Sequence, residues 1–422
     1  MKRLAPPVFA LALACCSSSS SVTPKPAGDS STDVLEVSPP DADDEADATP
    51  RCTAKVNKGP WSLAVDETSA KIRWESCVPG SSGLTLTPEG GGPSMKFASK
   101  TTEAIITDTD EAPLLGDADF AGTYTMHEVA LTGLKASTCY AYVLDADSTA
   151  KGRVCAARAP GDSFSFIALG DTNPGLHATG TMIADAYASH PDFTIHGGDI
   201  QYWSSGLETY QSWMEEMRPM LRAGAFFTSI GNHESERPNE YKNYVQRFFG
   251  GAGFDGSEYY RFESGGVWFF SIDTEQDVGK SSPQGAWLQA ELLDASKKPG
   301  FRFSVVFFHR PWVTCGDTGD DKTSRDAYAP IFESVGVKLV VQAHMHGYER
   351  FEIGGLTYVT AAGGGGALGN VDENITREEC AFRKVSGAFY NTVRFDVKPG
   401  QLIGTATDNH GVVRDSFTKI VP

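Results

Sequence analysis

The sequence predicts a layered α/β domain at residues 161–422, with an all-β sandwich before it at residues 51–160. A chain of 422 residues exceeds the length that one hydrophobic core usually serves, so two domains are the default expectation. After Pro160, short apolar runs alternate with stretches of helical spacing, which is typical of layered α/β domains. Before Pro160, short strands alternate with turns, which is typical of a β-sandwich of roughly 100 residues.

The N-terminus has the features of an export signal. Two basic residues precede an apolar run, Leu4–Ala14, that is too short to span a bilayer. Residues 1–15 resemble a bacterial lipoprotein signal peptide, whose cysteine is lipidated and becomes the mature N-terminus. Cys15 follows a small residue and fits this role better; Cys16, or an ordinary cleaved signal, is the alternative. We expect an exported bacterial lipoprotein, periplasmic or at the cell surface, that meets the membrane only through this anchor.

The next segment, residues 16–50, is rich in Ser, Pro, Ala and acidic residues. Such a tract cannot bury enough apolar surface to offset its ordering entropy, so we expect a solvated linker. The net charge of −18 and the pI near 4.9 argue against a nucleic-acid partner, because binding the phosphate backbone needs a basic face.

Six further cysteines are dispersed along the chain, and no two of them form a Cys-x-x-Cys pair. A thiolate zinc site is therefore disfavoured. In an exported chain, dispersed cysteines favour disulfides. From their order and spacing we predict the pairs Cys52–Cys77, Cys139–Cys155 and Cys315–Cys380.

The segment 51–160 carries strands but no catalytic cluster. Residues 69–74 alternate with period two and place Ala70, Ile72 and Trp74 on one face. The segment resembles a fibronectin type III-like domain, with Trp74 as its core tryptophan and Leu134–Tyr140 as its corner tyrosine segment. We expect it to be a structural platform for the next domain.

In the segment 161–422, five predicted strands each end in potential metal ligands. Helices are expected between these strands, including one that carries the stripe from Tyr210 to Leu221 and ends at Pro219. The residues that follow the five strands are Asp171; Asp199 with Tyr202; Asn232 with His233; His309; and His344 with His346. Any one of them is most simply a turn or cap residue. Five such strand ends, holding four of the nine histidines, instead predict a shared site at the carboxyl edge of the sheets. The donors exceed what one zinc ion needs and suit two metal ions.

The order Gly-Asp-x, Gly-Asp-x-x-Tyr, Gly-Asn-His-Glu, strand-end His and His-x-His resembles the calcineurin-like metallophosphoesterases. Within them, Tyr202 in Gly198-Asp199-Ile200-Gln201-Tyr202 points to the purple acid phosphatases. The resemblance covers residues 163–422 and implies a four-layer α-β-β-α sandwich. The preceding β-sandwich also fits the two-domain build of that family.

The resemblance also implies a ligand set and a mechanism. Fe(III) would be held by Asp171, Asp199, Tyr202 and His346. A divalent Zn, Fe or Mn ion would be held by Asp199, Asn232, His309 and His344, with Asp199 bridging the two metals. Tyr202 would bind as a phenolate and give a visible absorption band. A metal-bound hydroxide would attack the phosphate, and His233 would contact the phosphate and assist the leaving group as a general acid.

The sequence also departs from the family pattern. Asn173 stands where the first motif often has glycine, and Ala343 replaces the glycine often found before His-x-His. The loop 310–315 has none of the histidines that plant and animal members place there for substrate. Residues 363–366 are four glycines and predict a close-packed loop near the site. His177 and Arg310 are candidates for substrate contact, with a supporting or surface role favoured for each.

The expected function is hydrolysis of phosphate monoesters by an acid phosphatase-like enzyme, with a small phosphate ester as substrate. The first alternative is a Mn- or Zn-dependent phosphodiesterase in which Tyr202 does not bind metal. The second is a surface lipoprotein that binds phosphate groups without turnover.

Overall fold

The computed structural model describes residues 52–106, 122–173, 179, 181–200, 202, 207–235, 245–250 and 258–422. What the sequence predicts for the signal peptide, the linker, Cys15, Cys16 and His177 stays a prediction, because they lie outside these residues. Among the helices of the described ranges, none is both long and apolar enough to cross a membrane.

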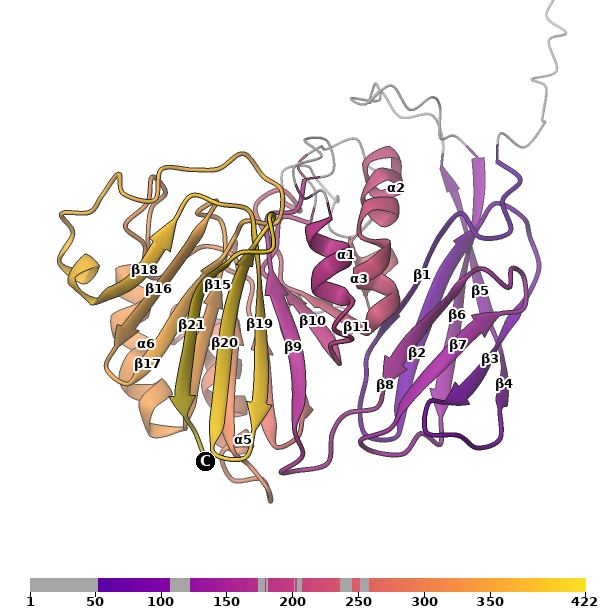
Figure 1. The fold of residues 1–422 in the computed structure, drawn as a ribbon, viewed down its shortest axis with the longest axis horizontal. Coiled ribbons are helices and arrows are strands. Elements are labelled where there is room, and N and C mark those ends of the chain that lie inside the picture. The colour runs from indigo at the N-terminus through magenta and orange to yellow at the C-terminus, as the bar shows by residue number, and fades with distance from the viewer. Residues whose placement is uncertain are drawn as a thin grey trace, which may run out of the picture. The chain divides into compact units, whose positions relative to one another are not determined.

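The N-terminal part consists of two β-sheets (Figure 1). One sheet has the order β1-β2-β6-β5 and the other β4-β3-β7-β8. The strands are β1 Lys58–Leu63, β2 Ser69–Ser76, β3 Gly83–Pro88, β4 Met95–Ala98, β5 Lys100–Ile106, β6 Gly122–Thr132, β7 Cys139–Leu144 and β8 Lys151–Cys155. The predicted β-sandwich is therefore present.

The sandwich core contains the face that the alternation of residues 69–74 predicts. Ala70, Ile72 and Trp74 are buried together with residues of β3, β6, β7 and β8. The Trp74 ring also stacks on His127 at 4.7 Å between centroids. Tyr140 is buried, and its hydroxyl oxygen accepts a 2.9 Å hydrogen bond from the backbone N–H of Lys135. This bond closes the turn before β7.

Two further sheets form the C-terminal part. In the first, β9 Phe164–Leu169, β10 Phe193–His196 and β11 Ala225–Thr228 are parallel, and β19 Asn391–Lys398, β20 Gln401–Asp408 and β21 Val413–Ile420 extend the sheet antiparallel. The second has the order β12-β13-β14-β15-β17-β16-β18. Its strands are β12 Tyr260–Ser264, β13 Val267–Ser271, β14 Phe303–Phe307, β15 Val337–Gln342, β16 Tyr348–Ile353, β17 Leu356–Ala361 and β18 Arg383–Gly387.

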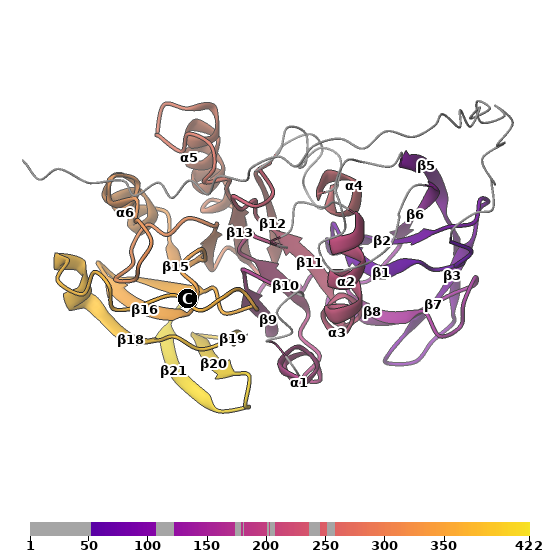
Figure 2. The same ribbon diagram turned by 90° about the horizontal axis from the view of Figure 1, so that it is seen from above.

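Alternating side chains make both sheets the inner layers of a helix–sheet–sheet–helix stack (Figure 2). On β11, Phe226 packs against Trp213 of α2, whereas the next residue, Phe227, stacks on Phe262 of the facing sheet. Val305 and Val306 of β14 likewise belong to two different cores. The helices are α1 Met182–Tyr187, α2 Leu207–Glu216, α3 Arg218–Ala223, α4 Gln246–Phe249, α5 Pro283–Ala295 and α6 Lys322–Ser334, with a 3-10 helix η3 at Glu378–Phe382. Leu288 of α5 and Phe332 of α6 are buried in the outer core of the second sheet.

The stripe from Tyr210 to Leu221 is core, as predicted, but it does not form one helix. Helix α2 ends at Glu216, and Pro219 lies in the first turn of α3 rather than at the end of the earlier helix. Proline is tolerated in a first turn because the backbone N–H that it lacks would have no helical partner there.

The sandwich and the C-terminal sheets are joined directly. Strand β1 pairs with β11 in parallel through Ser62 and Ala225, which makes one sheet of ten strands. Residues 50–422 form one compact unit; the domain boundary near residue 160 stays a prediction. The structure confirms all three disulfides, Cys52–Cys77, Cys139–Cys155 and Cys315–Cys380.

Replacing Trp74 with alanine should lower the free energy of unfolding by about 3–5 kcal/mol, because the lost ring leaves a cavity in the sandwich core. Chemical denaturation followed by far-UV circular dichroism measures this. Ile105, which is 76% exposed, provides the control, since Ile105→Ala should change stability by about 0.5 kcal/mol at most. Equal stability of the two variants would contradict the core placement of Trp74.

Candidate metal centre

The predicted ligands meet because the strands that carry them run parallel. Strands β9, β10 and β11 are neighbours in one sheet, and β14 and β15 are neighbours in the facing sheet. Their carboxyl ends therefore lie at one edge of the stacked sheets. The hydrogen bond between the N–H of His344 and Asp171 Oδ2, 3.1 Å long, joins the edges of the two sheets.

One group of donor atoms surrounds Tyr202. Its hydroxyl donates to Asp171 Oδ1 at 2.9 Å and lies 2.7 Å from Nε2 of His346. His346 Nε2 is in turn 3.2 Å from Asp171 Oδ1. The other ring nitrogen of His346, Nδ1, lies 2.6 Å from the carbonyl oxygen of Ala367, which it can only donate to. That contact leaves Nε2 as the ring nitrogen with a lone pair for a metal.

A second group surrounds His309. Its Nε2 lies 3.0 Å from Asn232 Oδ1, 3.0 Å from His344 Nδ1 and 3.3 Å from Asp199 Oδ2. Its Nδ1 is 2.9 Å from the carbonyl oxygen of Gly197. A proton on Nδ1 satisfies that carbonyl and leaves the Nε2 lone pair directed at the cluster. Asp199, His309 and His344 thus offer three metal-binding atoms within 4.8 Å of one another.

The chain holds three of these residues in unusual backbone conformations. Asp171, Asp199 and His344 have φ values of +59°, +50° and +67°. Residues other than glycine adopt this left-handed region at a cost, on the order of 1–3 kcal/mol each, unless their surroundings fix it. Each is the turn residue that re-aims a side chain from the end of a strand towards the site.

Glu234 fixes the turn that carries Asp199. No role was predicted for Glu234 from the sequence. Its carboxylate is 1% exposed and accepts hydrogen bonds from the backbone N–H groups of Asp199, Ile200 and Gly231 at 2.8–2.9 Å. Burial, with a contribution from the charge of Asp199, raises the pKa of Glu234 to about 8. The sequence signal that could have identified Glu234 is an acidic residue directly after the Asn-His pair at the end of a strand.

A second supporting contact lies beneath the site. The Thr172 hydroxyl donates to the carbonyl oxygen of Ile200 at 2.5 Å and accepts from Trp213 Nε1 at 2.9 Å. His196 Nε2 lies 3.1 Å from the same hydroxyl oxygen. Burial lowers the pKa of His196 to about 4, so its ring is neutral. These contacts tie the β9 and β10 turns to helix α2.

The electrostatics of the site suit a cation. Burial alone would lower the pKa of His309, but the adjacent Asp199 carboxylate raises it to about 10. Burial and the charges of Asp171 and Asp199 raise the pKa of Tyr202 well above its usual value. A phenolate at Tyr202 therefore needs a strongly charged cation at its oxygen.

The chemistry of the donor set suits such cations. Carboxylate, amide and imidazole donors with a phenol match the preferences of first-row transition metals. Within each group the contacts cited above are 2.7–3.3 Å long, which is close to the spacing of atoms that share one metal ion. All seven predicted ligands are brought together in these two groups.

One family model matches the region that carries the predicted ligands. The sequence model of the family described as Calcineurin-like phosphoesterase matches residues 164–348. That segment contains every predicted metal ligand. Residues 164–348 are therefore similar to this family.

Curated relatives match the chain over about half its length. Purple acid phosphatase 22 of Arabidopsis thaliana is 25% identical over 239 residues, which cover 54% of each protein. An uncharacterized protein of Mycobacterium tuberculosis is 28% identical over 261 residues, or 52% of this chain and 49% of its own. The chain therefore spans about half the length of the curated relatives that it matches.

Two solved structures share the fold. A purple acid phosphatase from yellow lupin seeds (Lupinus luteus) superposes with a TM-score of 0.68 at 17% identity, covering 85% of this chain and 73% of its own. The structure of PhoD gives a TM-score of 0.62 at 12% identity and covers 88% and 92%. At these identities the likeness concerns the fold alone.

His233 occupies the solvent side of the candidate site. Its side chain is 21% exposed, and its Nε2 lies 3.8 Å from Asp199 Oδ2. Its ring centroid is 4.4 Å from that of Tyr202, and its backbone N–H donates to Asp199 Oδ1 at 3.0 Å. A molecule entering from solvent can therefore reach this imidazole next to the two donor groups.

The departures from the family pattern fit locally. The methyl group of Ala343 packs against Gly170 and Gly197, since a Cβ on either glycine would lie within 2.9 Å of it. The glycine loop lies against the site, as predicted. Gly366 donates its N–H to the carbonyl oxygen of Asp171 at 2.8 Å, and a Cβ on it would lie 2.9 Å from the ring of His346.

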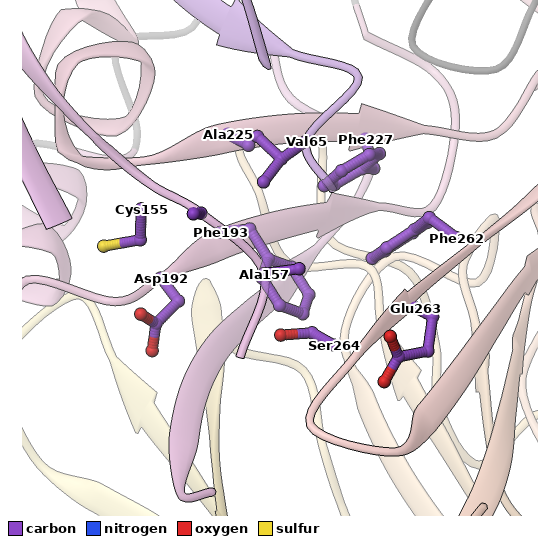
Figure 3. A pocket seen from close by; sticks show the side chains of 11 residues that line it. Val65, Cys155, Ala157, Asp192, Phe193, Ala225, Phe227, Phe262, Glu263 and Ser264 are labelled. Carbon is purple, nitrogen blue, oxygen red and sulfur yellow. The ribbon is translucent and has the colours of Figure 1, made fainter. Parts of the chain in front are cut away.

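A separate cavity lies beside β8, β10 and β11 (Figure 3). Its volume of about 10 Å³ admits no more than a single water molecule, so it cannot take a phosphate ester. Ligand atoms of Cys139, Cys155 and Asp192 lie close enough together nearby to hold a metal ion. Both cysteines are in a disulfide, so neither offers a thiolate. This cluster is therefore not a free metal site.

Glu234→Gln should weaken metal retention by about 10- to 100-fold, the range typical for residues that orient metal ligands. The amide has one acceptor oxygen where the carboxylate has two, so the N–H groups of Asp199, Ile200 and Gly231 lose part of their acceptor. Metal content after dialysis against graded chelator measures this. Glu128→Gln, at a partly exposed ion pair with Arg73, is the control. Equal metal content in both variants would contradict the role of Glu234.

Proposed function

We propose that the chain hydrolyses phosphate monoesters at a dinuclear metal centre. The observation that carries the proposal is the presence of two donor groups at the same sheet edge. Asp171, Tyr202 and His346 would hold Fe(III), and Asn232, His309 and His344 a divalent Zn, Fe or Mn ion. Asp199 would contribute to both sites.

Such metal ions, when bound, neutralise the charge on a phosphoryl group and lower the pKa of water. The protein supplies orientation and proton transfer. Asn232 and His344 are fixed by their contacts to His309, so the divalent site is preformed. His233 lies on the open side and would donate a proton to the departing alcohol. The glycine loop lets backbone rather than side chains close one wall of the site.

The phosphodiesterase alternative has one specific observation in its favour. The surroundings of Tyr202 oppose ionisation of its phenol, which is what a non-ligating tyrosine would show. The contact of Tyr202 with both Asp171 and His346 supports the monoesterase reading, because it places the phenol oxygen inside a donor group.

Two further proposals concern the rest of the chain. The buried Trp74 and the bond between Tyr140 and Lys135 support a fibronectin type III-like assignment for the sandwich. The three disulfides support export, because disulfides persist in oxidising compartments. A lipid anchor at Cys15 or Cys16 followed by the 16–50 linker would then hold the enzyme near a membrane surface.

The purified, metal-loaded protein should show a broad visible absorption band with iron present, because a tyrosinate bound to Fe(III) absorbs there. Tyr202→Phe should lose the band while keeping its far-UV circular dichroism. Tyr140→Phe, a buried tyrosine of the sandwich, should keep the band. A colourless wild-type protein holding two Mn or Zn ions, even after reconstitution with iron, would favour the diesterase alternative.

Asn232→Ala should lower kcat/KM for p-nitrophenyl phosphate by more than about 100-fold, because it removes a ligand of the divalent ion. His233→Ala should cost about 10²–10⁴-fold in kcat, the range of general acid catalysis, and should leave the metal content unchanged. Wild-type activity in both variants would refute the site assignment. Faster turnover of bis-(p-nitrophenyl) phosphate than of the monoester would support the diesterase.

A further inference from the structure

Arg310 follows His309 directly and lies at the rim of the site. Its side chain is 45% exposed. The Glu275 carboxylate accepts from Arg310 Nε at 2.7 Å and from Nη2 at 2.9 Å. The third nitrogen of the guanidinium, Nη1, lies 3.3 Å from Nε2 of His344. One side of the arginine fork is therefore anchored, and the other is directed at the metal centre.

The anchor is itself held in place. The N–H of Glu275 donates to Asp273 Oδ1 at 2.8 Å. Gln284 of α5 binds both the N–H and the carbonyl oxygen of Asp273, at 2.6 and 2.9 Å. The backbone N–H of Arg310 donates to the Thr274 hydroxyl at 2.8 Å. An exposed ion pair alone contributes little to stability, but one fixed in this way preorganises a guanidinium for an anion.

In the proposed ligand set, Arg310 Nη1 and His344 Nε2 both carry a hydrogen and are both hydrogen-bond donors, although they lie 3.3 Å apart. His344 Nδ1 faces His309 Nε2 and is the ring atom that belongs to the donor group. With Nδ1 as the metal ligand, the ring proton is on Nε2, and a guanidinium nitrogen cannot accept it. The two neighbouring N–H groups do not satisfy each other. An anionic oxygen between them would accept from both.

We propose that Arg310 binds a second anionic group of the substrate, next to the scissile phosphate. The inference rests on the proposed phosphoester hydrolysis. Arg310 Nη1 lies beside Nε2 of His344, the ring nitrogen that is not part of the donor group, so an anion held there would lie next to the metal site rather than inside the donor group. The favoured substrates carry a further phosphate or carboxylate on the leaving group. Water supplies oxygen to the scissile phosphorus, and the leaving group departs with the electrons of the P–O bond and takes a proton.

The test compares two substrates in the metal-loaded protein. Inorganic pyrophosphate has an anionic leaving group, and p-nitrophenyl phosphate carries no second anionic group. Arg310→Gln should lower the ratio of their kcat/KM values, pyrophosphate over p-nitrophenyl phosphate, by about 10- to 100-fold, the range expected for a charged hydrogen bond. Arg310→Lys, which keeps the charge but not the fork, should recover part of that ratio.

Arg414→Gln is the matched control. Arg414 is 46% exposed and its Nε pairs with Asp408 at 2.6 Å, so it resembles Arg310 in exposure and pairing, and it should leave the ratio unchanged. Thermal unfolding checks that every variant is folded. An active chain whose ratio is unchanged in Arg310→Gln overturns the inference alone. A wild-type chain that hydrolyses neither compound contradicts the proposed function and the inference with it.

Discussion

The metal centre depends on the apolar contact between two facing sheets. Its ligands come from both sheets, and the bond between Asp171 and His344 joins residues 173 positions apart in sequence. Phe166, Phe193 and Phe269 fill the space between the sheets, with ring centroids 5.2–5.4 Å apart. Close packing of this kind transmits small changes in volume, so the spacing of the donor atoms is set by side chains that have no chemical role.

The site positions its ligands through unfavourable backbone conformations as well as through packing. Asp171, Asp199 and His344 all adopt positive φ values, and Glu234 fixes one of these turns through three backbone N–H groups. Preorganisation of this kind leaves little reorganisation for the moment of metal or substrate binding.

Most of the site could be predicted from the sequence because each ligand directly follows an apolar strand, and the strand pattern is local. Asp171 and His309 are examples, since both come within two residues of a buried run. Glu234 and Thr172 could not be assigned roles in this way, because their partners are brought close only by the fold: backbone N–H groups for Glu234, and the Ile200 carbonyl with the Trp213 ring for Thr172. The helix break before Pro219 was misplaced because proline can follow the end of one helix or stand in the first turn of the next, and the spacing of the apolar residues is compatible with both. The antiparallel strands β16, β18 and β21 were not predicted, since mixed polar patterns such as that of β21 carry little periodic signal.

Because β1 pairs with β11, the N-terminal sandwich covers an edge of the C-terminal sheet. Strand β11 is the last strand of the C-terminal part on this side of the sheet, and all four of its residues are buried. Without β1 beside it, the outer N–H and C=O groups of this apolar strand would form an open edge, which recruits strands from other chains. The sandwich thus acts as an edge cap, and the C-terminal sheets cut away from it would be prone to aggregate even with the predicted metal ligands in place.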